Sequence, residues 1–152
     1  MKSHLLKNQI IMFIVMLIVG MFFNPMSILA YSHKHLYVSL TSFYSGLFMA
    51  SNMMWAHEIV KYLSMGHFNL LVFSIGIILS ISISTLLLRQ QLLVNDKQWL
   101  KRMIPHHSTA MTTTTKLLEN NNNFKNNPIL YRVAKNIVEN QEREILYMKS
   151  LL

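Results

Sequence analysis

The sequence predicts an all-α protein with three transmembrane helices followed by a C-terminal antiparallel helical hairpin. Hydrophobic residues make up 52% of the 152 residues. They lie in long uncharged blocks before residue 91, which is typical of membrane spans. After residue 91 the composition becomes polar, and apolar residues recur at helical spacing. We therefore expect a membrane region at 1–91 and a helical hairpin domain at 95–152.

Three uncharged apolar stretches predict spans at about 10–30, 36–55 and 68–88. Each has about the 20 residues that a helix needs to cross the hydrocarbon core of a bilayer. Lys2 and Lys7 precede the first stretch, so a cleaved signal peptide is the alternative reading of it. Because its end is a poor cleavage site, we favour an uncleaved span.

Helix-breaking residues set the ends of these elements. The Asn24-Pro25 pair interrupts the first stretch and is expected to kink its helix. The second helix is expected to continue past the bilayer surface to about Leu63, followed by a turn at 65–67.

Three spans place the two ends of the chain on opposite sides of the membrane. The distribution of Lys and Arg mildly favours a cytoplasmic C-terminal domain.

The C-terminal domain is expected to contain two helices joined by a polar loop. The Asn95-Asp96 pair can cap the first helix, with Asp96 as the side-chain acceptor, and this helix would run to about Glu119. Residues 120–127 are polar and end before Pro128, which suits the first turn of a helix. That second helix is expected to end near Leu151.

Composition excludes several classes of function. The chain has no cysteine, which excludes disulfides, zinc–thiolate sites and thiol nucleophiles. The formal net charge is +8, but no basic run is interleaved with aromatic residues, so no nucleic-acid partner is expected. Neither Glu-x-x-His nor His-Glu-x-x-His occurs, and we expect no enzyme activity. The 12 methionines are suited to Cu(I) and equally to apolar packing.

The segment around Pro105 carries the most informative pattern. Met103, His107 and Met111 are spaced i, i+4 and i+8, so they share one face of the first C-terminal helix. His106 stands beside them. Pro105 removes one helical hydrogen bond and is expected to bend the chain. The segment therefore gathers thioether and imidazole groups on one helix.

The second C-terminal helix offers a matching face. Gln141, Glu144 and Met148 are spaced i, i+3 and i+7. In an antiparallel pair, Met103 then meets Met148 and His107 meets Glu144. A cluster of Met, His and Glu across one seam suits a soft or borderline metal ion. Apolar packing and a simple His–Glu pair explain the same residues without metal.

This region resembles the domain-of-unknown-function family 305, a ferritin-like helical family. The matching residues are Asp96, Trp99, Leu100, Met103, Ile104, Pro105, His106, His107, Ala110, Gln141, Glu144, Ile145 and Met148. The resemblance implies that the hairpin is a ferritin-like half-bundle. It also implies copper binding through Met and His, in a secreted or membrane-attached protein. The chain departs from the family at Thr113, where a second Met is usual.

We therefore expect a membrane-tethered metal-binding protein that sequesters or handles copper, with Cu(I) favoured. The predicted metal ligands are Met103, His106, His107, Met111, Glu144 and Met148. The resemblance to exported relatives predicts an extracytoplasmic C-terminal domain. Besides the lipid bilayer and the metal ion, a homodimer is an expected partnership, because two helices alone bury little core. Docking of the hairpin onto the membrane spans of the same chain is the alternative. The alternative is a structural membrane module whose hairpin mediates assembly without metal.

Overall fold

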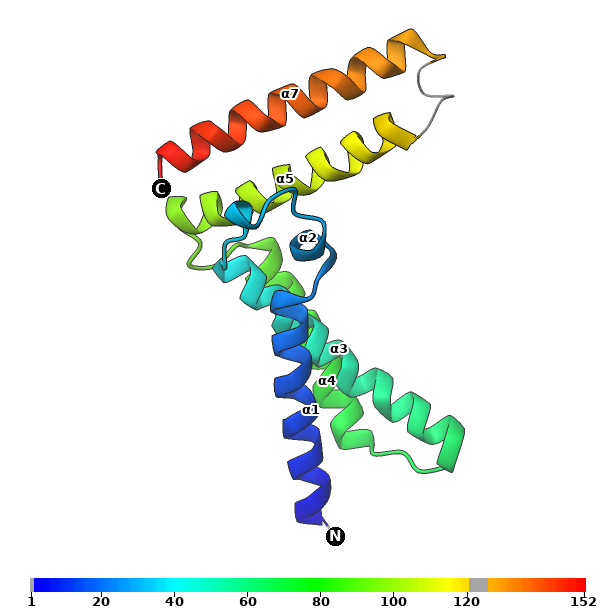
Figure 1. Cartoon of the computed structure of the whole chain (residues 1–152). Coiled ribbons are helices and arrows are strands. Elements are labelled where there is room, and N and C mark those ends of the chain that lie inside the picture. The colour runs from blue at the N-terminus through cyan, green and yellow to red at the C-terminus, as the bar shows by residue number, and fades with distance from the viewer. Residues whose placement is uncertain (1, 121–125) are drawn as a thin grey trace. The chain divides into compact units, whose positions relative to one another are not determined.

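A computed structural model describes residues 2–120 and 126–152 of the chain. These residues form helices and contain no strand (Figure 1), so the all-α prediction is confirmed for them. The longer α-helices are α1 (Lys2–Phe22), α3 (Leu40–Met65), α4 (Leu70–Ser82), α5 (Asp96–Asn120) and α7 (Pro128–Ser150). The shorter elements are α2 (Pro25–Ile28), the 3-10 helix η1 (His33–His35) and the π-helix η2 (Ile83–Arg89).

The helices form two compact units. Unit 1 contains Met1–Phe23 and Leu40–Val94, and unit 2 contains Asn24–Ser39 and Asn95–Leu152. The second unit therefore includes more than the two C-terminal helices. Sequence analysis had placed the segment from Asn24 to Ser39 in the membrane region.

Unit 1 is organised around α3, which packs against both α1 and α4. Glycines allow both contacts. A Cβ atom on Gly20 would lie 2.8 Å from the Cα of Gly46, so α1 and α3 cross with their backbones nearly touching. A Cβ atom on Gly76 of α4 would lie 2.9 Å from the backbone nitrogen of Trp55. Close crossings through small residues are common between membrane helices.

Two stretches, Lys7–Ile28 and Leu70–Arg89, are long and apolar enough to cross a membrane. The first covers most of α1 and continues to the end of α2, and the second lies within unit 1. They overlap the first and third predicted spans. The prediction of three spans is wrong, because the stretch at 36–55 does not meet the same criterion. Most of it belongs to α3, whose hydroxyl, amide and charged side chains lower its hydropathy. Several of those polar side chains are buried, namely Thr41, Ser42, Ser51 and Glu58.

The breaks between helices follow local chemistry. The first apolar stretch is divided and not merely kinked, because α1 ends at Phe22 and a separate helix starts at Pro25. Asn24 caps that helix, and its Oδ1 accepts a hydrogen bond of 3.0 Å from the Ser27 N–H. After α3, Gly66 has a φ of +71°, which a glycine adopts without strain. The turn therefore falls within the predicted residues 65–67.

In unit 2, α5 and α7 pack against each other and run in opposite directions (Figure 1). Apolar side chains from both helices form the core of the contact. The buried members are Leu100, Ile104, Met111, Ile145 and Met148. Ile104 and Ile145 are almost completely buried, so each contributes roughly 1.5–3 kcal/mol of hydrophobic stabilisation.

Both long helices of unit 2 begin at an asparagine cap. Asn95 Oδ1 accepts a hydrogen bond of 3.0 Å from the Gln98 N–H, so the acceptor is Asn95 and the expected role of Asp96 is wrong. The carboxylate of Asp96 lies instead in the first turn of α5, where its negative charge interacts favourably with the positive end of the helix dipole. At the start of α7, Asn127 caps and Pro128 occupies the first turn. The predicted loop at 120–127 falls largely outside the described residues.

Candidate functional site

A groove of about 570 Å³ lies between α5 and α7 within unit 2. Its lining residues are Trp99, Met103, His107, Asn140, Arg143, Glu144, Tyr147 and Met148. On α5 the lining residues are four positions apart, and on α7 they follow the same helical spacing. Each helix therefore presents one continuous stripe to the groove.

The groove gathers four of the six predicted site residues, namely Met103, His107, Glu144 and Met148. His106 is exposed and does not line it. Adjacent helical residues differ in direction by about 100°, so His106 and His107 cannot share one face. Met111 packs in the core instead, where only 4% of it is exposed, and lines a separate cavity of about 210 Å³.

His107 and Glu144 form the central polar pair of the groove. The imidazole Nδ1 lies 3.0 Å from Glu144 Oε2, although the pair is not aligned as a hydrogen bond. Burial lowers the pKa of His107; the Glu144 carboxylate opposes this shift, and His106 adds to it. The lowered pKa favours the neutral imidazole at pH 7. Because Nδ1 is buried, Nε2 is the ring nitrogen left to bind a ligand.

The two groove methionines also belong to the apolar core or its edge. Met148 is 6% exposed, and Met103 packs against the same cluster. Among the described residues, no group of three or more His, Asp or Glu side chains lies close enough to hold a metal ion. A metal in this groove would therefore depend on the thioether sulfurs. Such a donor set does not suit Mg²⁺ or Ca²⁺ and favours a soft ion.

Four lining residues of the groove were not predicted as site residues, namely Trp99, Asn140, Arg143 and Tyr147, although Trp99 was among the residues of the family resemblance. A signal for two of them was present. Trp99 lies four residues before Met103, and Asn140 lies four residues before Glu144. Extending the α5 stripe by one turn would have included Trp99, and counting back four residues from Glu144 would have included Asn140. Their aromatic and polar groups border the predicted ligands.

Residues 24–39 are bound to the helix that carries His107. The Tyr31 N–H donates a hydrogen bond of 2.7 Å to the completely buried Ser108 Oγ, and His35 Nδ1 lies 2.9 Å from the same atom. Thr109 Oγ1 donates to the carbonyl of Met26 at 3.2 Å. These contacts attach residues 24–39 to α5 at the two residues that follow His107. No local pattern in the sequence predicted them.

Comparison with known proteins adds one finding. Residues 87–152 match the sequence model of a family described as a domain of unknown function (DUF305). The match supports the resemblance drawn from the motif around Pro105, and it covers both helices of the groove. The chain has no match among curated proteins or solved structures. The family description names no ligand, so the chemistry of the groove carries the functional argument.

Proposed function

We propose that this chain is a membrane-anchored protein that binds Cu(I) in the groove between α5 and α7. The observation that carries the proposal is the convergence of two thioethers and a neutral imidazole, from Met103, Met148 and His107. Thioether and imidazole ligands suit Cu(I), whereas hard divalent ions prefer oxygen. The absence of a described His and carboxylate cluster fits a soft ion better than Zn²⁺.

Within this proposal, His107 and Glu144 have different roles. His107 would bind copper through Nε2. Glu144 Oε2, which lies 3.0 Å from Nδ1, would turn to accept the Nδ1 proton once copper occupies Nε2, as carboxylates commonly do for metal-bound histidines. Glu144 is then a positioning residue and not a ligand. Its side chain is 54% exposed, so solvent reaches this edge of the groove, which suits uptake and release of an ion.

The membrane part of the proposal rests on unit 1. Its two apolar stretches are long enough to span a bilayer, and they expose large apolar side chains. We propose that unit 1 anchors the chain and that unit 2 faces away from the cytoplasm. Retention in the membrane at alkaline pH tests the anchor. Protease added to intact cells should remove unit 2, and protection until lysis would reverse the orientation.

Copper binding is tested with the full-length protein in detergent. Cu(I) is titrated under anaerobic conditions against a chromogenic chelator that competes for it. His107→Gln should weaken binding by at least about ten-fold, because even residues outside the ligand shell change affinity by this amount. Met148→Leu should also weaken binding while preserving apolar volume.

Matched controls come from the two predicted ligands that do not line the groove. His106→Gln repeats the substitution made at His107, and Met111→Leu repeats the one made at Met148. Both controls should leave Cu(I) affinity within about two-fold of wild type. Equal losses in the controls would contradict this site. Zn²⁺ binding as tight as Cu(I) binding would contradict the role of the thioethers.

A second candidate function is a structural module that mediates assembly without metal. The observation that favours it is a set of exposed apolar side chains along α7, including Ile129, Val133, Leu146 and Tyr147. Such residues often mark protein contacts. A metal-free protein that forms a stable dimer, with Leu146→Lys restoring the monomer, would favour this function. Assembly that requires Cu(I) would combine the two functions.

A further inference from the structure

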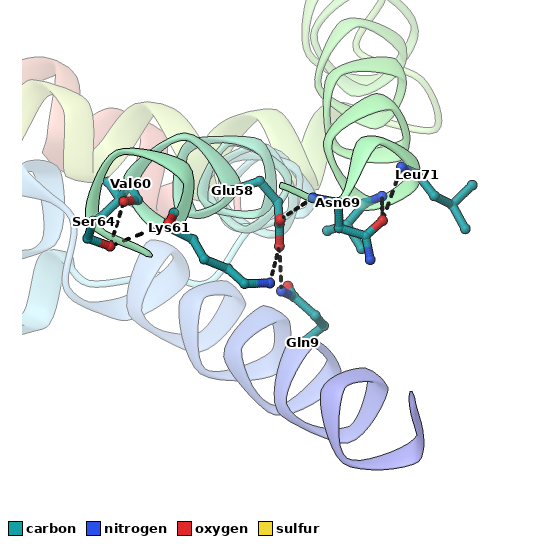
Figure 2. Close-up of polar contacts among 8 residues, drawn as sticks. Gln9, Glu58, Val60, Lys61, Ser64, Asn69 and Leu71 are labelled. Carbon is teal, nitrogen blue, oxygen red and sulfur yellow. Dashed lines mark hydrogen bonds and ion pairs between the residues drawn. The ribbon is translucent and has the colours of Figure 1, made fainter. Parts of the chain in front are cut away.

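A buried carboxylate joins α3 of unit 1 to the helices on two of its sides. Glu58 of α3 is completely buried, and three nitrogen atoms surround it (Figure 2). Gln9 Nε2 from α1 donates at 3.3 Å, the Asn69 N–H at the start of α4 donates at 2.9 Å, and Lys61 Nζ lies 3.7 Å away. A buried ionised carboxylate requires such partners, because it accepts hydrogen bonds and cannot donate them. The network therefore holds α1 and the start of α4 on α3.

A third face of α3 remains accessible. It carries a stripe of residues that are alternately four and three positions apart, namely Ser45, Met49, Asn52, Ala56, Ile59 and Leu63. None of the six is buried, whereas the buried residues of α3 all lie outside this stripe. Alternating spacings of four and three form the heptad pattern with which two helices wind around each other. The α3 stripe therefore has the form of a seam for another helix.

Asn52, in the middle of the stripe, has an amide group that is only partly satisfied. Its Oδ1 accepts a hydrogen bond of 3.1 Å from Trp55 Nε1. Because an indole nitrogen only donates, this contact fixes Oδ1 toward the indole and leaves Nδ2 as the free end of the amide. Nδ2 has no hydrogen-bond partner among the described residues, and it is not one of their buried unpaired atoms. An acceptor from outside the chain can therefore reach it.

The depth of Asn52 limits what can supply that acceptor. Ser80 Oγ of α4 lies 3.1 Å from the Oγ of the neighbouring Ser51, and Ser80 is in the middle of the apolar stretch Leu70–Arg89. With this stretch across a bilayer, Asn52 lies near the midplane. Lipid ester groups are then about 15 Å away, which is half the thickness of the hydrocarbon core. Water is absent at this depth, so an unpaired N–H is costly there.

We propose that the α3 stripe is the surface through which two copies of this chain pair in the membrane. Copies inserted in the same orientation and related by a two-fold axis present Asn52 at the same depth. Each Nδ2 then donates to Oδ1 of Asn52 in the other copy, because that oxygen has a second lone pair. A second copy thus supplies the acceptor that lipid cannot. This inference rests on the proposed membrane anchoring of unit 1 and does not depend on copper binding.

The other residues of the stripe suit a helix as partner. Ser45 and Ala56 are small, which lets two membrane helices approach closely. Met49 and Ile59 are 39% and 38% exposed, so both have apolar surface left to bury. A groove of about 380 Å³ opens beside the stripe between α3 and α4, and Asn52 and Ile59 belong to its lining. Side chains of a second copy would enter this groove as well.

The first test is disulfide cross-linking, because the chain has no cysteine of its own. Ile59→Cys places a thiol on the stripe. Val60→Cys is the matched control, since Val60 is 61% exposed and points about 100° away around the helix at nearly the same depth. The full-length variants are reconstituted in liposomes without copper and oxidised with dithiodipyridine. Ile59→Cys should be linked into a dimer and Val60→Cys should stay monomeric, because a disulfide needs Cβ atoms about 4 Å apart.

The second test measures the contribution of Asn52. The dimer dissociation constant is obtained in liposomes from energy transfer between labelled chains as the protein is diluted with lipid. Asn52→Leu should raise this constant about ten-fold, or about 1.4 kcal/mol, which is the order expected for two interhelical hydrogen bonds in lipid. Asn52→Gln retains the amide and should recover most of the affinity.

A pair of bulky substitutions keeps the test decisive if Asn52→Leu does not fold. Ala56→Phe places a ring in the seam and should prevent pairing, because the two α3 helices could no longer approach closely. Val60→Phe places the same ring outside the stripe and should leave the dissociation constant unchanged.

Several results would overturn the proposal. Equal linking of the two cysteine variants, or none in either, would show that the stripe faces lipid. Loss of the dimer in Leu146→Lys would place the interface on α7. A monomer that carries an apolar carbonyl compound, detected by native mass spectrometry, would show that such a molecule satisfies Asn52. Extraction at alkaline pH would refute the membrane anchor and this interface with it, whereas a failed Cu(I) titration would refute only the copper site.

Discussion

The two units of this chain have opposite interiors. Unit 2 buries Leu and Ile between α5 and α7, as a protein domain in water does. Unit 1 brings its helices together through small and polar residues and leaves many large apolar side chains exposed. The buried residues of unit 1 include Gly20, Gly46, Ser51, Glu58, Gly76 and Ser80. Between helices in lipid, burial of apolar side chains supplies no hydrophobic driving force, because the lipid chains are apolar too. Close backbone packing and polar contacts therefore hold such helices together.

This difference can be measured with two intrinsic probes. The chain has two tryptophans, Trp55 in unit 1 and Trp99 in unit 2. Trp99→Phe leaves a reporter of unit 1, and Trp55→Phe leaves a reporter of unit 2. If the units follow different packing rules, substitutions of opposite kinds should destabilise them.

The largest effect is expected for Glu58→Ala in unit 1. The substitution removes a completely buried carboxylate and leaves the Gln9 amide and the Asn69 N–H without their acceptor. Breaking a buried pair typically costs about 3–5 kcal/mol of unfolding free energy. Unfolding followed by Trp55 fluorescence measures the loss. Glu119→Ala, at an exposed ion pair, is the control and should change little. A loss below about 1 kcal/mol for Glu58→Ala would contradict a structural role of the network.

The next largest effect is expected for Ile104→Ala in unit 2. This side chain is 0% exposed, so its truncation removes buried apolar surface and leaves a cavity. We expect the unfolding free energy reported by Trp99 to fall by about 2–5 kcal/mol. Ile129→Ala at the exposed start of α7 makes a related change and should have little effect. Similar losses in both variants would show that burial in unit 2 is not what stabilises it.

A smaller loss of stability is expected for Gly46→Ala in unit 1, where the substitution adds an atom to a close contact. The added Cβ would lie 2.7 Å from the Leu17 carbonyl oxygen, and backbone atoms cannot yield as a side-chain end can. Overpacking of this kind costs about 1–3 kcal/mol. Trp55 fluorescence should report the loss. A gain in stability, as helix propensity alone predicts for Gly→Ala, would mean that α1 and α3 do not cross closely.

Local signals in the sequence predicted the helices better than their partners. Pro128 begins a helix and Gly66 occupies the predicted turn, because both depend on the backbone of a few neighbouring residues. The binding of Tyr31 and His35 to Ser108 was not predicted. Those residues are more than seventy positions apart, and no periodic pattern encodes such a contact. The error about the second span arose because freedom from charge was taken as evidence of high hydropathy.

The candidate site follows the same division. Spacing of four residues on α5 and on α7 was enough to bring Met103, His107, Glu144 and Met148 to one groove. It could not show that Met111 faces the core, since a core residue and a ligand have the same spacing. The copper reading itself came from chemistry and from resemblance, and it stays a prediction until binding is measured.

The smallest expected effect is a dependence of unit 2 on pH. Burial lowers the pKa of both His107 and His35 from the usual 6.5. Below about pH 6.5 the unfolded chain therefore binds more protons than the folded one, and the unfolding free energy should fall as pH falls. The effect on His107 is limited, because its protonated ring would gain the nearby Glu144 carboxylate. Trp99 fluorescence between pH 5 and pH 7.5 measures the slope, which His107→Gln and His35→Gln should each reduce. A stability that rises toward pH 5 would mean that the Glu144 pair outweighs burial, and it would remove the argument for a neutral His107 as a metal ligand.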